Sequence, residues 1–202
     1  AVLALHGNGT DASTTVTDSS SGAKTVTANG NAQIDTAQSK FGGASIQLDG
    51  DGDYLTSADS ADWDFGTGDF TIDFWIRVND TGIGSKFVFD RNDGNPYSFF
   101  HNTAGNFIVA FNNSQVIVEA AGISANVWYH IAITRSGTNL RLFKDGTQLG
   151  TTRTDSSDLS GTTELVIGRH PSGGTTYWPG HIDELRISKG IARWTANFTP
   201  PT

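Results

Sequence analysis

The sequence predicts an all-β fold in which two antiparallel sheets pack face to face as a sandwich. Apolar and polar residues alternate along several short segments, and this period of two is typical of strands with one buried face. Stretches of Gly, Asn, Asp, Ser and Thr separate these segments, and 24 glycines among 202 residues suit tight turns. Many short strands joined by such turns are typical of a β-sandwich or jelly roll.

In chain order, the first expected strand is the short apolar segment 2–6. The clearest strand covers residues 70–78, where every second residue is apolar and the positions between them include Asp73 and Trp75. Trp75 therefore falls on the less apolar face, where it either lines a groove or packs under a loop. Further short strands are expected over residues 87–90, 97–101, 107–111 and 116–119.

The second half of the chain continues the same pattern. Residues 127–135 alternate again, and a turn at 136–139 leads into an expected strand over 140–144. Asp145-Gly146 follows and supplies the positive φ angles of a tight hairpin. The last strands are expected over residues 164–169 and 181–188.

Composition limits the classes of partner. The chain has 13 basic and 21 acidic residues, a formal net charge of −8, and a surface of this sign repels phosphate backbones. We therefore expect no nucleic-acid partner. The absence of cysteine excludes disulfides, thiolate metal sites and cysteine nucleophiles. No segment has the length and apolarity of a transmembrane helix, so we expect no membrane insertion.

The apolar fraction of 36% is sufficient for one core, and we expect a single domain over residues 1–202. The chain begins at Ala1, contains no methionine and ends near the pair Pro200-Pro201. These features indicate a fragment of a longer protein.

Three parts of the chain match the pattern of a known family in order. They cover residues 41–75, 128–146 and 167–194, and they include Phe41-Gly42-Gly43-Ala44-Ser45, Trp128-Tyr129-His130-Ile131-Ala132 and Gly180-His181-Ile182-Asp183-Glu184-Leu185-Arg186-Ile187. The sequence resembles the laminin G-like, concanavalin A-like jelly-roll modules of the lectin-glucanase superfamily, of the type found in bacterial surface and phage virion proteins. The resemblance implies two facing antiparallel sheets, often a calcium ion at the rim, and recognition of glycans or proteins in an extracellular, cell-surface or virion setting.

Glycan hydrolysis is the weakest of the functions considered. Retaining hydrolases need two carboxylates roughly 5 Å apart, and the glucanases that this chain resembles carry them in a Glu-x-Asp-x-(x)-Glu run on one strand. The chain lacks that run, and its three glutamates, Glu119, Glu164 and Glu184, lie on separate expected strands. Gly-x-Ser-x-Gly and His-Glu-x-x-His runs are absent too. We therefore expect no enzymatic activity, although a carboxylate pair built from Asp residues stays open.

Asp183 is the most informative acidic residue. Strict alternation places it on the same face as Leu185 and Ile187, and a buried carboxylate must be paired, hydrogen-bonded or bound to a metal. One interpretation is a structural Ca²⁺ site in which Asp11 and Asp18, from the loop after the first strand, join Asp183. The alternative is that Asp183 accepts hydrogen bonds from loop N–H groups or from an arginine.

The predicted ligand surface lies where loops meet the strand ends. Tyr177 and Trp178 follow a loop rich in Gly, Ser and Thr, and their rings could form a platform on which a sugar stacks. The alternative is that Trp178 packs over the sheet edge as a lid, because large aromatic side chains are buried on average. The polar and aromatic residues expected beside the platform are Arg169, His170, Arg91, Asn95 and Tyr97.

The sequence leaves two functions open for the same sandwich. The first is a non-catalytic carbohydrate-binding or adhesion module, whose partner is a glycan or surface polysaccharide. The alternative is a structural module of a phage virion or cell-surface protein, whose contacts are with other proteins. Binding to a glycan panel would favour the first function, and self-association in light scattering would favour the second.

Overall fold

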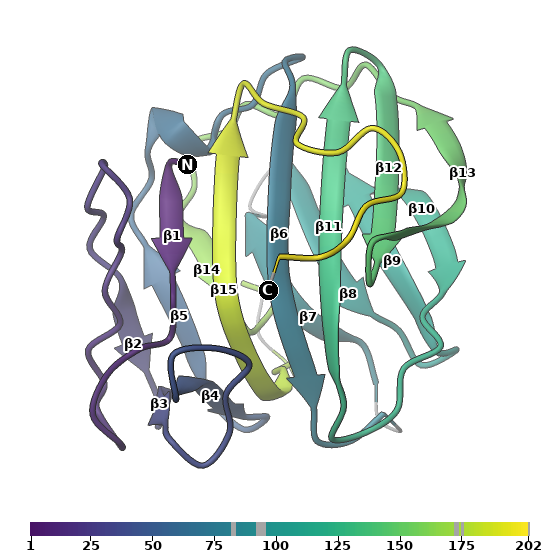
Figure 1. Cartoon of the computed structure of the whole chain (residues 1–202). Coiled ribbons are helices and arrows are strands. Elements are labelled where there is room, and N and C mark those ends of the chain that lie inside the picture. Colours follow the sequence, from purple (N-terminus) through teal and green to yellow (C-terminus); the bar gives the residue numbers. More distant parts are fainter. Residues whose placement is uncertain (82–83, 92–95, 172–173, 175, 202) are drawn as a thin grey trace.

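A computed structural model describes residues 1–81, 84–91, 96–171, 174 and 176–201 of the chain. It confirms the predicted all-β sandwich, in which two antiparallel sheets face each other (Figure 1). The described residues also contain a short 3-10 helix, Ala61–Trp63, and they contain no helix with the length and apolarity needed to cross a membrane.

The eight-stranded sheet, called sheet A here, contains both the first and the last strand of the chain. In spatial order it consists of β13 (Thr147–Thr154), β12 (Asn139–Lys144), β11 (Trp128–Ser136), β6 (Phe70–Val78), β15 (Pro179–Lys189), β4 (Ser45–Asp49) and β3 (Gln33–Asp35), and β1 (Leu3–Leu5) pairs with β15. The first and last strands are therefore neighbours, which brings the loop after β1 beside β15.

The seven-stranded sheet, called sheet B here, packs against the inner face of sheet A. In spatial order it consists of β10 (Ser114–Ala120), β9 (Asn106–Phe111), β8 (Tyr97–His101), β7 (Lys86–Arg91), β14 (Leu165–Ile167), β5 (Tyr54–Ser57) and β2 (Thr27–Asn29). Several of these strands contain only three or four residues, too few for a period of two to be visible in the sequence.

The core lies between the two sheets and is centred on β6. The apolar set of this strand, predicted by its alternation, faces inward, and the ring of Phe74 lies 5.8 Å from Phe89 and 5.6 Å from Phe99 of sheet B. The two neighbours of β6 in sheet A are β11 and β15, so β6 is the central strand of the sheet. Its outward residues consequently lie in the middle of the outer face of sheet A.

A β-bulge in β15 changes the phase of the strand. Asp183 pairs with Trp75 of β6, but the next pair is Arg186 with Asp73, so two residues of β15 face one residue of β6. The prediction that Asp183 shares a face with Leu185 and Ile187 is therefore wrong. Leu185 and Ile187 belong to the core, whereas Asp183 lies opposite the outward Trp75.

The C-terminal segment 190–201 crosses the outer face of sheet A, where it is drawn in yellow in Figure 1. Thr71 of β6 donates a hydrogen bond to the carbonyl oxygen of Ile191, and Thr134 of β11 donates one to that of Trp194. The rings of Trp194 and Phe198 stack at 4.0 Å. This segment covers part of the outer face and leaves the rest open.

We predict that Phe74→Ala lowers the free energy of unfolding by about 3–5 kcal/mol, because it removes the ring that joins the two sheets and leaves a cavity. Urea denaturation measures this change. The control is Val118→Ala on β10, where the side chain is 43% exposed, and its effect is expected to stay within about 0.5 kcal/mol. Equal effects of the two substitutions would contradict the assignment of Phe74 to the core.

Candidate functional site

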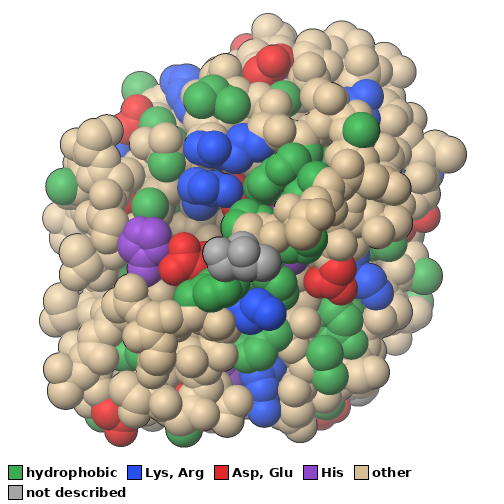
Figure 2. Space-filling view, in the orientation of Figure 1, with side chains coloured by type: hydrophobic (Ala, Val, Ile, Leu, Met, Phe, Trp, Pro, Cys, Tyr) green, Lys and Arg blue, Asp and Glu red, His purple; other side chains and the backbone are tan. Residues whose placement is uncertain are grey.

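A cavity of about 390 Å³ lies on the outer face of sheet A. Its walls come from β1, β6, β11 and β15, together with the loop before β4 and the end of the C-terminal segment (Figure 2 shows this face). The lining residues are Ala4, Leu5, His6, Phe41, Asp73, Trp75, His130, Glu184, Leu185, Arg186 and Pro201. Neighbouring strands thus place outward side chains from distant parts of the sequence around one space.

A bidentate ion pair forms one side of the cavity. The Arg186 guanidinium donates from Nε to Oδ1 of Asp73 at 3.0 Å and from Nη2 to Oδ2 at 2.8 Å. The Asp73 side chain is 4% exposed and that of Arg186 is 30% exposed, so the arginine presents its outer edge to the cavity. The β15 bulge creates this pair, because it sets Arg186 opposite Asp73.

His130 of β11 forms the floor of the cavity and is almost completely buried. In the described part of the chain neither of its ring nitrogens has a hydrogen-bond partner, and Nε2 lies 3.8 Å from Oδ2 of Asp73. Its ring packs at right angles against Trp194 and edge-on against Trp75. A buried polar group without a partner costs about 1–3 kcal/mol, so a ligand that supplies hydrogen-bonding groups would gain from meeting it.

Another part of the cavity lining combines a histidine–carboxylate pair with an aromatic ring. Both carboxylate oxygens of Glu184 lie 2.9 Å from Nδ1 of His6, and both side chains are partly exposed. Phe41 is half-buried and meets the edge of Trp75, while Lys40 covers the face of Trp75 at 4.0 Å. Trp75 is only 7% exposed, so Phe41 supplies the accessible aromatic surface.

Residues 49–193 match the family model for laminin G-type domains of the concanavalin A-like lectin/glucanases superfamily. The chain belongs to this superfamily. The match covers the strands that form most of both sheets and three sides of the cavity, from Asp73 through His130 to Arg186.

Among curated proteins, this concanavalin A-like chain is similar to an alpha-L-arabinofuranosidase of Bifidobacterium longum subsp. longum. The two are 27% identical over 207 residues, a match that covers 91% of this chain and 18% of the enzyme. The chain therefore spans less than a fifth of that relative.

Among solved structures, the chain resembles the binding domains of clostridial toxins. The binding domain of Paraclostridial Mosquitocidal Protein 1 superimposes with a TM-score of 0.74 at 16% identity, covering 95% of this chain and 49% of that one. The binding domain of botulinum neurotoxin serotype D/C gives a TM-score of 0.70 at 17% identity, with 94% and 49% coverage. The chain thus spans about half of each toxin domain, and at this identity the likeness establishes the fold alone.

The superfamily fold buries the predicted stacking residue Trp178. Its side chain is 0% exposed and belongs to the core, and its backbone N–H donates to the carbonyl oxygen of Gly168. The structure therefore agrees with the alternative of a packed lid, and Trp178 does not form a sugar platform. Tyr177 is half-buried 6.5 Å from Tyr54, and the Arg169 guanidinium lies 3.8 Å over the Tyr54 ring. Tyr177 and Arg169 thus lie together, apart from the cavity.

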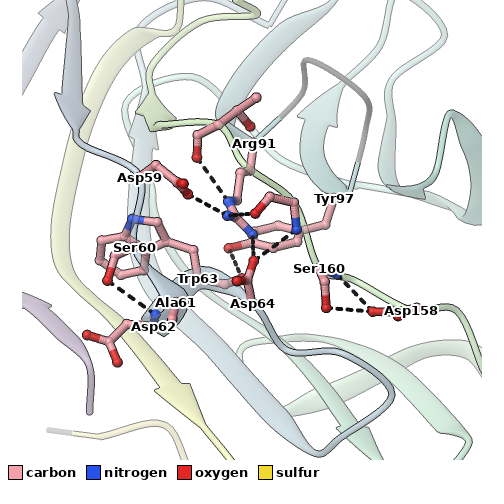
Figure 3. Close-up of polar contacts among 12 residues, drawn as sticks. Asp59, Ser60, Ala61, Asp62, Trp63, Asp64, Arg91, Tyr97, Asp158 and Ser160 are labelled. Carbon is pink, nitrogen blue, oxygen red and sulfur yellow. Dashed lines mark hydrogen bonds and ion pairs between the residues drawn. The ribbon is translucent and has the colours of Figure 1, made fainter.

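Arg91 and Tyr97 are buried as well, and the prediction that they contact a ligand does not fit their positions. Arg91 forms ion pairs with Asp64 at 2.6 Å and with Asp59 at 2.9 Å, as Figure 3 shows. The Tyr97 hydroxyl donates to the Trp63 carbonyl oxygen at 3.2 Å, and burial raises the pKa of Tyr97. Both side chains hold the segment around the 3-10 helix against sheet B. Asn95, predicted beside them, lies outside the described residues.

The hydrogen bonds of Asp183 fit the second interpretation given for it. The carboxylate accepts from the backbone N–H groups of Lys40, Phe41 and Glu184 at 2.8–3.0 Å. Burial raises the pKa of Asp183 to about 6, and these donors oppose the rise. Because the backbone donors already occupy both oxygens, Asp183 anchors the loop that carries Phe41 to the cavity wall.

Asp11 and Asp18 do not join Asp183. Asp18 is buried and accepts from the N–H groups of Ala4, Ser20 and Lys24, whereas Asp11 is exposed and accepts from Thr36. Within the described part of the chain, no group of three or more His, Asp or Glu side chains is arranged to hold a metal ion. These three acids therefore do not fit a shared Ca²⁺ site, and calcium binding by the domain stays a prediction.

A smaller hollow of about 160 Å³ lies on the outer face of sheet B, where Phe87, Phe100 and His170 form part of its lining. Beside it, Asp90 is completely buried, and no other described residue donates a hydrogen bond to its carboxyl oxygens. Nε2 of His170 lies 3.8 Å from Oδ2 of Asp90. Burial raises the pKa of Asp90 to about 8.

We predict that Asp90→Asn stabilises the protein at pH 8 by about 1 kcal/mol or more and changes stability little at pH 4. Because the folded pKa exceeds the unfolded value of about 3.9, the folded state binds the proton more tightly, and stability falls as pH rises from about 4 to 8. The Asn side chain does not ionise, so the stability of the Asp90→Asn variant does not fall in this way as the pH rises. Urea denaturation across this pH range measures the effect, with the exposed Asp51→Asn as control. Parallel pH profiles for Asp90→Asn and the unsubstituted protein would contradict the prediction.

Proposed function

We propose that this domain is a non-catalytic carbohydrate-recognition module that binds a glycan in the cavity of sheet A, in an extracellular, cell-surface or virion setting. The observation that carries the proposal is the composition of the cavity. The cavity is lined by the half-buried ring of Phe41, by the planar polar pair Asp73–Arg186, and by His130, whose ring nitrogens have no hydrogen-bond partner among the described residues.

This composition suits the chemistry of sugars. A sugar ring has apolar C–H faces that pack on aromatic rings and a rim of hydroxyls that donate and accept hydrogen bonds. The outer N–H groups of Arg186 can donate to hydroxyl oxygens, and the Glu184 carboxylate can accept from a hydroxyl. The volume of about 390 Å³ falls in the range of small-molecule sites and suits a short saccharide.

The similar structures give supporting context. One belongs to botulinum neurotoxin type C, whose cell entry is dependent upon interaction with two ganglioside molecules, and another is the binding domain of botulinum neurotoxin DC in complex with SialylT. About half of each of those chains lies outside the match, so this binding is a property of those proteins. It supports a glycan as the class of partner to test first.

Hydrolysis is the second candidate, favoured by the similarity to an arabinofuranosidase and by the presence of Asp73 and Glu184 in one cavity. Each of these carboxylates is held by a basic side chain, Asp73 by Arg186 and Glu184 by His6. A general acid must instead carry a proton near neutral pH. The paired state of both acids favours binding over bond cleavage.

We predict that Phe41→Ala weakens glycan binding about tenfold or more, because it removes the accessible aromatic wall of the cavity. A glycan array identifies the saccharide, and titration calorimetry measures the change in its Kd. The matched control is Phe100→Ala, which removes a half-buried ring from the hollow on sheet B and should leave the Kd unchanged. Loss of binding in the Phe100→Ala variant alone would place the glycan on the other sheet and overturn the site.

We also predict that the domain releases no p-nitrophenol from p-nitrophenyl α-L-arabinofuranoside above the background rate. Turnover that disappears in both Asp73→Asn and Glu184→Gln would establish hydrolysis and replace the proposal. If the array gives no hits and light scattering shows stable self-association, the protein–protein alternative would be favoured instead.

A further inference from the structure

Basic side chains gather at the mouth of the cavity although the whole chain has a net charge of −8. Figure 2 shows a group of Lys and Arg side chains on this face. Arg186 lines the cavity, and its guanidinium is neutralised by Asp73. Two further cations lie near it on separate segments: Arg193 bonds to Ser188, two residues along β15 from Arg186, and Lys40 lines the hollow that adjoins the cavity.

Arg193 belongs to the C-terminal segment and is exposed. Its Nε donates to the Ser188 hydroxyl at 3.0 Å, and within the described part of the chain it forms no ion pair. Burial of part of the side chain and the neighbouring Arg186 guanidinium lower the pKa of Arg193, while Asp73 opposes this. Asp73 pairs with Arg186, so the charge of Arg193 has no carboxylate partner among the described residues.

Lys40 stands on the opposite side of the opening. A second hollow, lined by Lys40, Thr199 and Pro200, shares Phe41, Trp75 and Pro201 with the cavity and extends it toward Lys40. The ammonium group lies 4.0 Å above the Trp75 ring, and among the described residues it has no carboxylate partner. The two carboxylates that line the cavity, Asp73 and Glu184, already have basic partners, whereas Lys40 and Arg193 have no carboxylate partner among the described residues.

We infer that the cavity selects an acidic saccharide, a sugar that carries a carboxylate, with Arg193 and Lys40 as the residues that distinguish it from its neutral counterpart. This inference rests on the proposed function and deepens it. A carboxylate is planar and accepts two parallel N–H bonds from a guanidinium, so the free outer edges of the arginines match it in shape as well as charge. Its sugar ring then packs on Phe41, and its hydroxyls face His130.

A single carboxylate fits this surface better than a polyanion does. The unmatched positive charge is confined to the cavity mouth, whereas the chain as a whole is acidic and repels extended phosphate chains. Phe41, His130 and Arg186 line the same cavity of about 390 Å³. Stacking, hydrogen bonding and charge can therefore act on a single sugar residue of a glycan.

The test compares matched saccharides that differ only in charge. Trigalacturonic acid and its methyl ester form one pair, and sialyllactose and its methyl ester form another. Titration calorimetry is carried out at about 25 mM and 300 mM NaCl. We expect at least one acid to bind about tenfold more tightly than its neutral partner at low salt and to lose most of this advantage at high salt, because exposed charges are screened.

The variant that tests the contact is Arg193→Gln, since this side chain is exposed and lies outside the core. It should weaken binding of the acid about fivefold and leave the neutral partner unchanged. Lys189→Gln is the control, because it also removes one exposed positive charge, but Lys189 pairs with the inward Phe70 and its Nζ donates to the Ala61 carbonyl oxygen, away from the cavity. An equal loss in both variants would indicate general attraction and overturn the inference.

The remaining outcomes separate this inference from the proposed function. A neutral saccharide that binds as tightly as its acid overturns the selection for charge and leaves carbohydrate recognition intact. Absence of binding to every saccharide on the array overturns both. Binding of the acid that is insensitive to Phe41→Ala but lost in Arg193→Gln would place the anion outside the cavity and also overturn the inference.

Discussion

The burial of β6 on both of its faces is the constraint from which the rest of the structure follows. On the inner face, Phe74 packs between the sheets, as expected for the central strand of a sandwich. On the outer face, Thr71, Asp73 and Trp75 are also shielded from water, so each polar group needs a partner from another element. Thr71 takes its partner from the C-terminal segment and Asp73 takes Arg186. The cavity is the part of this covered face that protein atoms do not fill.

The bulge in β15 places the charged side chain of Arg186 on the outer face of sheet A, opposite Asp73. With strict alternation after Ile182, Leu185 would point outward and Arg186 would point into the core. The extra residue restores Leu185 and Ile187 to the core and sets Arg186 opposite Asp73. Glu184, the residue at the bulge, adopts a φ of 52°, a conformation that is uncommon for a side chain larger than glycine. Glu184 lines the cavity, so this uncommon backbone conformation lies at the cavity wall. Bulges often redirect side chains next to functional sites.

Most of the fold could be predicted from the sequence because its longest strands alternate. The predicted strand over 70–78 coincides with β6, and the expected strand over 127–135 differs from β11 by one residue at each end. The strands of three residues could not be found by periodicity, and β13 is exposed along most of its length, so it has no apolar face to detect. The unequal spacing of Ile182, Leu185 and Ile187 was a usable sign of the bulge.

The candidate site was harder to predict from the sequence than the fold, because it depends on the order of the strands in sheet A. Aromatic and arginine residues at strand ends suggested a ligand surface, but Trp178, Arg91 and Tyr97 are buried there because such large side chains fill the ends of the sandwich. The cavity instead joins Asp73, His130 and Arg186, which are far apart in sequence. Trp75, on the polar face of its strand, was the one signal that pointed to this surface. Only the pairing of β6 with both β11 and β15 brings these side chains together.

The positions and partners of the acids support the proposal of recognition rather than cleavage. Hydrolysis by paired carboxylates needs one acid that keeps its proton near neutral pH and a second, ionised carboxylate within about 5–9 Å of it. In the cavity, Asp73 forms a bidentate pair with the Arg186 guanidinium, and Glu184 pairs with His6. The carboxyl group whose pKa burial raises to about 8 is Asp90, which is enclosed in sheet B and does not line the sheet A cavity. Asp183 of sheet A, whose pKa burial raises to about 6, does not line the cavity either, and its oxygens accept backbone N–H groups. What remains at the cavity is a set of groups suited to holding a polar ligand in place.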